Sequence, residues 1–179
     1  LDPLIDAAAR PEAADIGFLL IGKGVEKPQL QQRAQALGLK NILFLDPIEK
    51  RAVPCALALA DIAYIGWHDS PLYQFGTSPN KLFDYMLAGL PVVHATNSPY
   101  DLVRDAGCGT SVAADDVPAI ADAIAGLARL PAAERKALGL RGKGFVQQHH
   151  SYPTLARQFL ESLGAPPPAS TTIPVSQRC

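Results

Sequence analysis

Short apolar runs rich in β-branched residues alternate with longer amphipathic runs along most of the chain. The short runs predict five strands, at 16–21, 42–45, 62–65, 91–94 and 110–112. The amphipathic runs predict helices between and after them, at 28–37, 53–60, 79–88, 100–106, 117–130, 132–149 and 152–163. Strands that alternate with helices are typical of a parallel sheet covered on both faces, so we predict a doubly wound, Rossmann-like α/β fold.

The two ends of the chain differ from this pattern. Leu1, Leu4 and Ile5 have helical spacing with no strand before them, as expected of a chain that begins inside a larger fold. The segment 164–179 is rich in Pro, Ser and Thr and has no periodicity, a composition that buries too little apolar surface to fold. We therefore expect one domain over 1–163, followed by a disordered tail.

Composition argues against several classes of protein. The sequence of 179 residues has 16 Lys and Arg against 17 Asp and Glu, so no excess of positive charge favours nucleic acid or an anionic membrane. Cys55, Cys108 and Cys179 are widely spaced and in no metal-ligand pattern, which is typical of a reduced, cytoplasmic protein. No apolar run approaches the roughly 20 residues that span a bilayer, and no signal peptide is recognisable.

Two glycines follow the first predicted strand. Gly22, Lys23 and Gly24 come directly after Ile21, at the edge of the sheet where open α/β folds bind ligands. Glycine backbone can approach a phosphate closely, and Lys23 and Lys27 add positive charge. A tight turn without a ligand fits the same residues, because the motif is short.

A stronger candidate precedes the helix predicted at 79–88. Its residues are small, turn-forming, polar or basic: Gly76, Thr77, Ser78, Pro79, Asn80 and Lys81. Ser78 is a good N-cap, and Pro79 suits the first helical position. The amides of Asn80 and Lys81 then point out of the helix start, where the helix dipole favours an anion such as phosphate. The alternative is a well-capped helix that faces water.

Asp84 lies one helical turn after Asn80 and Lys81. Its carboxylate could accept hydrogen bonds from the hydroxyls of a ribose, as the acidic residue of dinucleotide-binding folds does. The alternative is an ion pair with Lys81. His68 and His94 follow predicted strands, but no nucleophile elbow, fixed carboxylate pair or metal cluster is recognisable, so no catalytic residue is assigned.

In their order, these segments resemble the C-terminal lobe of retaining glycosyltransferases of the GT-B fold, glycosyltransferase family 4. The resemblance covers about 4–163 and rests on 18–65, 78–93 and 106–127, of which SPNKLFDYMLAGLPVV at 78–93 is the most specific. It implies a lobe that binds a nucleoside-diphosphate sugar in cell-surface polysaccharide synthesis, with no metal or other cofactor. It also implies a missing first strand and a missing N-terminal lobe, which binds a glycan or lipid-linked acceptor and leaves open a contact with the inner face of the membrane.

The resemblance also implies roles for individual residues. Residues 78–81 would cradle the diphosphate, Gly22–Gly24 would line the opposite wall, and Asp84, in place of the second of two family glutamates, would hold the ribose. The first glutamate aligns with Gly76, which offers no side chain to the transferred sugar. The Arg and Lys that neutralise the diphosphate in the family precede this sequence, so the isolated chain is expected to be inactive. Topology suggests a pocket for the base near Asp46.

Two other functions remain open. Half of a UDP-sugar 2-epimerase has the same fold but needs acid and base carboxylates and a histidine that converge in the cleft. A nonenzymatic binding module of flavodoxin-like topology needs none of these. Finding an upstream lobe in the full-length protein would favour a transferase, because a transferase requires one.

Overall fold

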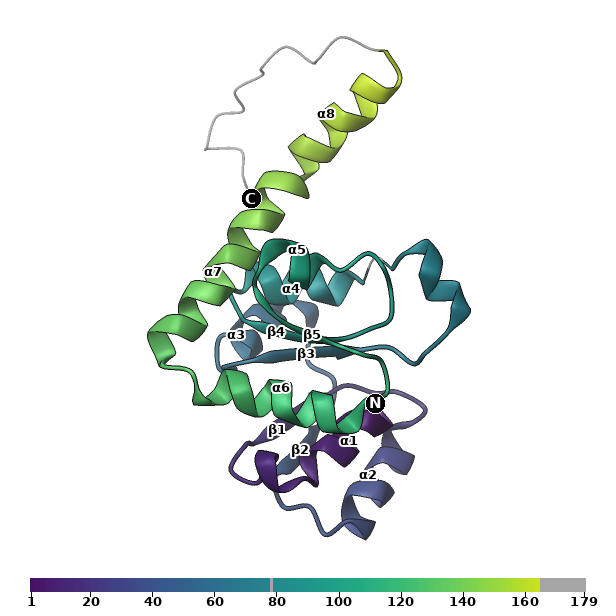
Figure 1. The fold of residues 1–179 in the computed structure, drawn as a ribbon, viewed down its shortest axis with the longest axis vertical. Coiled ribbons are helices and arrows are strands. Elements are labelled where there is room, and N and C mark those ends of the chain that lie inside the picture. Colours follow the sequence, from purple (N-terminus) through teal and green to yellow (C-terminus); the bar gives the residue numbers. More distant parts are fainter. Residues whose placement is uncertain (78, 165–179) are drawn as a thin grey trace.

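The computed structural model describes residues 1–77 and 79–164. Within them are five strands: β1 (Phe18–Ile21), β2 (Ile42–Leu45), β3 (Ala63–Gly66), β4 (Val92–Ala95) and β5 (Gly109–Val112). The helices are α1 (Asp2–Ala8), α2 (Lys27–Ala36), α3 (Val53–Leu57), α4 (Asn80–Leu87), α5 (Leu102–Ala106), α6 (Val117–Arg129), α7 (Ala132–His149) and α8 (Tyr152–Ser162) (Figure 1). Short 3₁₀ turns lie at η1 (Pro11–Ala13), η2 (Lys50–Ala52) and η3 (Pro71–Phe75). All of the predicted tail except Gly164 falls outside the described residues.

The predicted strands and helices are confirmed, with small shifts at their ends. α3 is shorter than predicted and ends at Leu57, since none of its residues is buried and no packed face extends it. Leu37, which the helical spacing places on the buried face of α2, is the C-cap residue just after the helix and is 47% exposed. Gly38 then ends the helix in the left-handed conformation expected of glycine, at φ +68°.

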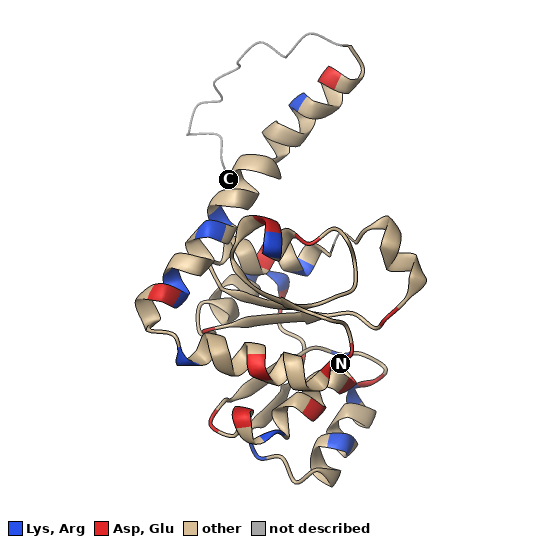
Figure 2. Cartoon of the chain, in the orientation of Figure 1, with Lys and Arg blue, Asp and Glu red and all other residues tan. Residues whose placement is uncertain are grey.

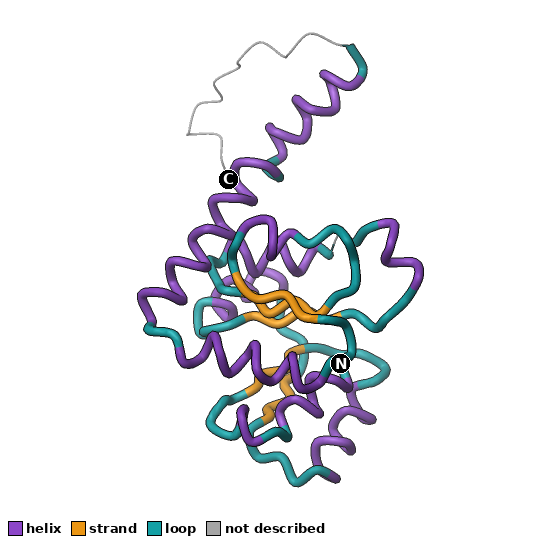
Figure 3. Tube along the Cα trace, viewed as in Figure 1, coloured by secondary structure: helices purple, strands orange, loops and turns teal. Residues whose placement is uncertain are grey.

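The five strands form two parallel sheets, whereas we expected one. β1 pairs with β2, and β4 lies between β3 and β5. Figure 3 shows the strands in two separate groups. Across the described part of the chain, no strand pairing joins β1 to β3. Side-chain packing joins the sheets instead, because Phe18 of β1 and Val93 of β4 belong to one core cluster with residues of α1 and α6. The α/β fold class is therefore as predicted, but the pairing is not.

Residues along β4 alternate between two layers. Val93 and Ala95 pack with α1 and α6, while Val92 packs with α4, α5 and α7. Met86 of α4 and Val146 of α7 belong to this second cluster. Helices therefore cover both faces of the β3–β4–β5 sheet, as a doubly wound fold requires (Figure 1).

The described residues cover only one face of the β1–β2 sheet. On that face, Leu20 packs against α1 and α2. On the other face lie two cross-strand pairs, Leu19 with Leu43 and Ile21 with Leu45, whose side chains are between 36% and 56% exposed. None of the described helices is long and apolar enough to cross a membrane.

Helix α7 crosses the turn between α4 and β4 at very short range. Gly89 forms this turn with φ +75°, and a Cβ atom at Gly139 of α7 would lie 1.7 Å from its carbonyl oxygen. A Cβ atom at Gly142 would lie 2.9 Å from the Cβ of Cys108. Glycine at these two positions lets α7 pack closely, which fixes the direction of α4. Helix α8 continues beyond α7 and projects away from the sheets (Figure 1).

Candidate functional site

Three loops leave the carboxyl ends of parallel strands on the same side of the β3–β4–β5 sheet. Residues 67–79 connect β3 to α4, residues 96–101 connect β4 to α5, and residues 113–116 connect β5 to α6. Ligands of open α/β sheets bind beyond this edge. The site predicted over residues 76–84 therefore lies where such folds bind their ligands.

Helix α4 begins one residue later than predicted. Pro79 is its N-cap, with an extended backbone at φ −78° and ψ 116°, and Asn80 is the first helical residue. Placing Pro79 at the first helical position was therefore wrong, while the capping role predicted for Ser78 falls on a residue outside the described part. The amide of Leu82 donates to the carbonyl of Pro79 at 3.0 Å. Asn80 and Lys81 thus contribute the first amides of the helix, which have no carbonyl four residues back within it.

The side chains of Asn80 and Lys81, on the first turn of α4, and of Asp84, one turn further along, are all exposed. Leu82 and Met86, which are buried, anchor the opposite face of the helix in the core. The ion pair between Lys81 and Asp84, which was the alternative role for the aspartate, is not formed among the described residues. A cation and a carboxylate therefore face solvent beside a helix start.

Gly76 brings the loop after β3 into contact with the loop after β4. Its backbone has φ +106°, a conformation that residues with side chains rarely adopt. A Cβ atom at this position would lie 3.3 Å from Cδ2 of Tyr100. The tyrosine ring lies close against the glycine and is nevertheless 64% exposed.

The predicted glycine turn, Gly22–Gly24, follows β1 in the other sheet. Lys27, which was expected to add positive charge for an anion, instead donates to a backbone carbonyl at the end of β2 and to the carboxylate of Asp46, at 2.8 Å and 2.9 Å. Asp46 therefore neutralises this lysine. Among the described residues, no hydrogen bond links the turn to residues 76–84.

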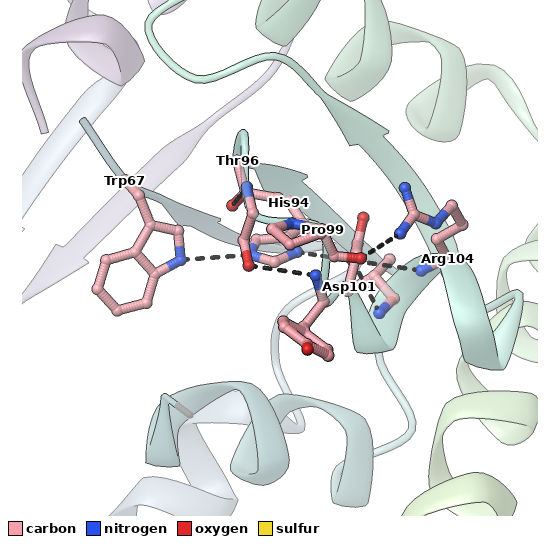
Figure 4. A network of polar contacts seen from close by, with 9 residues as sticks. Trp67, His94, Thr96, Pro99, Asp101 and Arg104 are labelled. Atoms are coloured by element: carbon pink, nitrogen blue, oxygen red, sulfur yellow. Dashed lines mark hydrogen bonds and ion pairs between the residues drawn. The ribbon is translucent and has the colours of Figure 1, made fainter. Parts of the chain in front are cut away.

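A buried network of polar side chains lies beneath the loops (Figure 4). Trp67 Nε1 donates to His94 Nε2 at 3.2 Å, and His94 Nδ1 lies 2.8 Å from Asp101 Oδ1. Because an indole N–H can only donate, Nε2 must accept, and the imidazole carries its proton on Nδ1, which donates to Asp101. The carboxylate also accepts the amides of Val103 and Arg104 and so caps α5.

The network holds Asp101 in its ionised form. Burial alone raises the pKa of a carboxyl group, but hydrogen bonds from His94 and Ser111 and from the Arg104 amide lower the pKa of Asp101 to about 2. The guanidinium of Arg104 donates back to the carbonyl of Pro99 at 2.9 Å. The loop at 96–101 is therefore tied to the buried carboxylate at its end.

A cavity of about 150 Å³ opens at the same edge of the sheet, between the starts of α1 and α2, the end of β3 and the loop after β5. Its polar lining includes Glu26, His68 and Asp115. Asp115, at φ +60°, accepts the amide of Asp69 at 2.9 Å and contacts His68 Nδ1 at 2.9 Å. The Asp69 amide and then His68 lower the pKa of Asp115, which joins the loops after β3 and β5.

Four residues of this region were not among the predicted site residues: Trp67, Tyr100, Asp101 and Asp115. Asp101 had a usable signal, because an aspartate directly before an apolar helix is a common N-cap. The positions of Trp67 and Tyr100 depend on how three loops pack together, which has no local signature in the sequence.

Acidic and basic residues are interspersed along the described part of the chain. Figure 2 shows acidic and basic residues in both halves of the molecule. In the part of the chain that the structure describes, no group of three or more His, Cys, Asp or Glu side chains is placed to hold a metal ion. Cys55 is exposed and Cys108 is buried, and both are free thiols.

Comparison with known proteins relates this chain to glycosyltransferases. A family model described as Glycosyl transferases group 1 matches residues 1–129. TuaH of Bacillus subtilis (strain 168), whose name describes a glycosyltransferase of teichuronic acid biosynthesis, is 32% identical over 103 residues, which are 55% of this chain and 25% of TuaH.

Solved structures show the same fold. WaaG, described as a glycosyltransferase involved in lipopolysaccharide biosynthesis, matches with a TM-score of 0.68 and 18% identity over 92% of this chain and 43% of WaaG. HepE of Anabaena in complex with UDP and glucose matches with a TM-score of 0.71 and 19% identity, over 92% of this chain and 44% of HepE. The structure of HepE in complex with UDP-glucose matches with a TM-score of 0.72 and 21% identity, over 91% of this chain and 44% of HepE. These matches confirm the predicted fold class, one half of a GT-B structure.

Proposed function

Because this chain belongs to the glycosyl transferases group 1 family, we propose that it is the donor-binding lobe of a retaining glycosyltransferase. The full-length protein would move a sugar from a nucleoside diphosphate to a glycan or lipid-linked acceptor in cell-surface polysaccharide synthesis. The observation that carries the proposal is the start of α4, where Lys81 and Asp84 are exposed one turn apart and do not pair with each other.

The start of α4 has the chemistry that a diphosphate requires. The first amides of the helix, at Asn80 and Lys81, and the helix dipole attract an anion, and the Lys81 ammonium adds a full positive charge. Asp84, one turn further along, offers two carboxylate oxygens to the two hydroxyls of a ribose. The two amides, the ammonium group and the carboxylate thus match a phosphate joined to a ribose, which UDP-, GDP- and ADP-sugars share.

The relatives support the class of donor and of product. HepE is described in complex with UDP, glucose and UDP-glucose, so UDP sugars are the first donors to test. TuaH and WaaG are described in teichuronic acid and lipopolysaccharide biosynthesis, which supports a cell-surface polysaccharide as product.

This chain spans about a quarter of TuaH and less than half of the solved proteins, and we place the acceptor site in the regions of those proteins that it does not match. In this proposal the protein is cytoplasmic, uses no metal, and contacts the inner face of the membrane only through those other regions. The role of Gly22–Gly24 as the opposite wall of the site stays a prediction.

The 2-epimerase alternative needs carboxylates and a histidine that face one space. In the described part of the chain, Glu26, His68 and Asp115 line one cavity at the carboxyl edge, while the His94–Asp101 pair is buried. These groups fit an epimerase too, so what favours the transferase is the glycosyltransferase family model that matches residues 1–129.

The experiment is a transfer assay with the full-length protein. UDP-, GDP- and ADP-sugars labelled at the anomeric carbon are supplied with lipid-linked and soluble glycan acceptors, and products are followed by NMR. The proposal expects transfer from one donor with the anomeric configuration retained. Conversion of a UDP sugar into its 2-epimer without an acceptor would replace the proposal with the epimerase.

A further inference from the structure

We propose that Tyr100 contacts the transferred sugar of the donor and helps to determine which sugar is accepted. This inference rests on the proposed function and adds to it a residue that determines specificity.

The first observation is the contact between Tyr100 and Gly76. A Cβ atom at Gly76 would lie 3.3 Å from Cδ2 of the ring, and the next nearest ring atoms would be at 3.8 and 3.9 Å. A Cβ at position 76 would therefore push the ring aside by a few tenths of an ångström, and a longer side chain would compete with the ring for this place. At 64% exposure, most of the ring remains accessible to a ligand. Glycine at position 76 thus makes room for an exposed aromatic side chain from another loop.

The second observation is the position of this contact along the chain. Gly76 precedes Asn80 by four residues, which span at most about 14 Å even when fully extended. A sugar joined to a diphosphate at the start of α4 therefore lies within reach of the residues around Gly76. A tyrosine ring offers an apolar face to the C–H groups of a sugar and a hydroxyl that can bond a sugar hydroxyl.

The third observation is that the loop carrying Tyr100 is held firmly. The Tyr100 amide donates to Ser98 Oγ at 3.2 Å, and the Ser98 amide donates to Thr96 Oγ1 at 3.0 Å. Both Thr96 and Ser98 are buried, and the loop ends at Asp101, which His94 holds. A loop whose backbone is fixed in this way loses little conformational freedom when a ligand binds beside it.

The same buried histidine also holds a second aromatic side chain at this edge. Trp67 donates to His94, and its ring lies 5.0 Å from that of Tyr73, centroid to centroid. His94 therefore connects both loops that meet at Gly76, and Trp67, which it holds, also lines the cavity at the end of β3.

The test compares binding of UDP with binding of UDP-glucose to the full-length protein by calorimetry, since only UDP-glucose carries the sugar. Where UDP does not bind, the GDP and ADP pairs are used. Tyr100→Ala should lower the affinity for the nucleotide sugar about three- to tenfold, in line with the loss of one aromatic contact, and leave the affinity for the nucleotide unchanged. Tyr100→Phe, which keeps the ring, should retain most of the affinity. Tyr152→Ala, at a tyrosine that is 91% exposed on α8, is the matched control.

Gly76→Ala provides a second variant that leaves Tyr100 itself intact. The new methyl group pushes against the Tyr100 ring. The variant should therefore reduce the ratio of the affinity for UDP-glucose to the affinity for UDP. If the wild type and Tyr100→Ala bind the nucleotide equally and the ratio is unchanged, this inference is wrong while the proposed function stands. If the wild type binds no nucleoside diphosphate and no nucleotide sugar, the proposed function fails and this inference fails with it. Thermal unfolding of each variant confirms that it is folded.

Discussion

His94 donates through Nδ1 to the carboxylate of Asp101 over 2.8 Å, and the two side chains are 1% and 2% exposed. A charged carboxylate at this depth is stable only because donors surround it. Trp67 donates to Nε2, the other nitrogen of the imidazole, and Asp101 caps α5. The pair therefore holds both the tryptophan and the start of α5 in place. A buried polar network thus holds the edge of the sheet where the candidate site lies.

Acid should weaken the fold through Asp101. Its pKa is about 2 in the folded protein, against an ordinary value of 3.8. A carboxyl group with a lowered pKa stabilises the fold at pH values above its ordinary pKa, and this contribution is lost as the pH falls from about 4 to about 2. The shift corresponds to about 2 kcal/mol of unfolding free energy. Urea unfolding of wild type and Asp101→Asn at several pH values measures it.

The wild type should have a higher unfolding free energy than Asp101→Asn at pH 7, and the two values should converge near pH 2. Asp105→Asn, at an exposed position of the same helix, is the control and should leave the pH dependence unchanged. A constant difference between wild type and Asp101→Asn over this range would contradict the account.

Replacing His94 should disturb the single tryptophan of the chain. In His94→Leu, the Trp67 indole N–H and the Asp101 carboxylate lose a buried partner, at an expected cost of about 1–3 kcal/mol each before any relaxation. The unfolding free energy should fall and the emission of Trp67 should shift. Tryptophan fluorescence followed during urea unfolding reports both effects. Unchanged emission in a folded variant would contradict the contact between Trp67 and His94.

Two glycines of α7 should respond in opposite directions to the same substitution. Gly139→Ala places a Cβ 1.7 Å from the carbonyl oxygen of Gly89, so helix and turn must separate. We expect a loss of about 1–3 kcal/mol, as for other overpacked sites. Gly144→Ala, with nothing within 4 Å of the new Cβ, should stabilise the helix by about 1 kcal/mol. Thermal unfolding of the two variants measures the difference, and equal effects would argue against the close approach of α7.

Asp84→Ala should impair use of the nucleotide-sugar donor by the full-length protein. The lost hydrogen bonds to a ribose are expected to lower kcat/KM for the donor by about tenfold or more, with little change in stability because the side chain is exposed. Asp122→Ala, at an exposed aspartate on α6, is the matched control. Steady-state kinetics with varied donor concentration measure kcat/KM for both variants. Equal values for Asp84→Ala and Asp122→Ala would show that Asp84 does not belong to the donor site.

Periodicity predicted most of the fold, because each strand and helix has a local signature. α7 was predicted with its observed ends, and Gly38 and Gly89 both have the positive φ expected at helix ends. The division into two sheets had no such signature. It depends on which strand edges meet in space, and here α1 and α6 join β1 to β4 through side chains alone.

The parts of the site formed by consecutive residues were predictable from the sequence. The contacts between residues of different loops were not. The start of α4 was recognised from consecutive residues, apart from the position of Pro79, whose extended backbone leaves it just outside the helix. Lys27 was expected to serve an anion, but Asp46 reaches it across the ends of β1 and β2. The contact between Tyr100 and Gly76 joins residues 24 positions apart and could only come from the fold.

The most direct test of the donor site is a titration of the isotope-labelled chain with UDP, GDP and ADP, followed by amide shifts in NMR. The account predicts that one nucleotide shifts the amides between Thr77 and Asp84, apart from Pro79, which has no N–H, with the largest changes at Asn80 and Lys81. It is contradicted if the same titration of the labelled full-length protein shows a nucleotide bound while these amides stay unchanged.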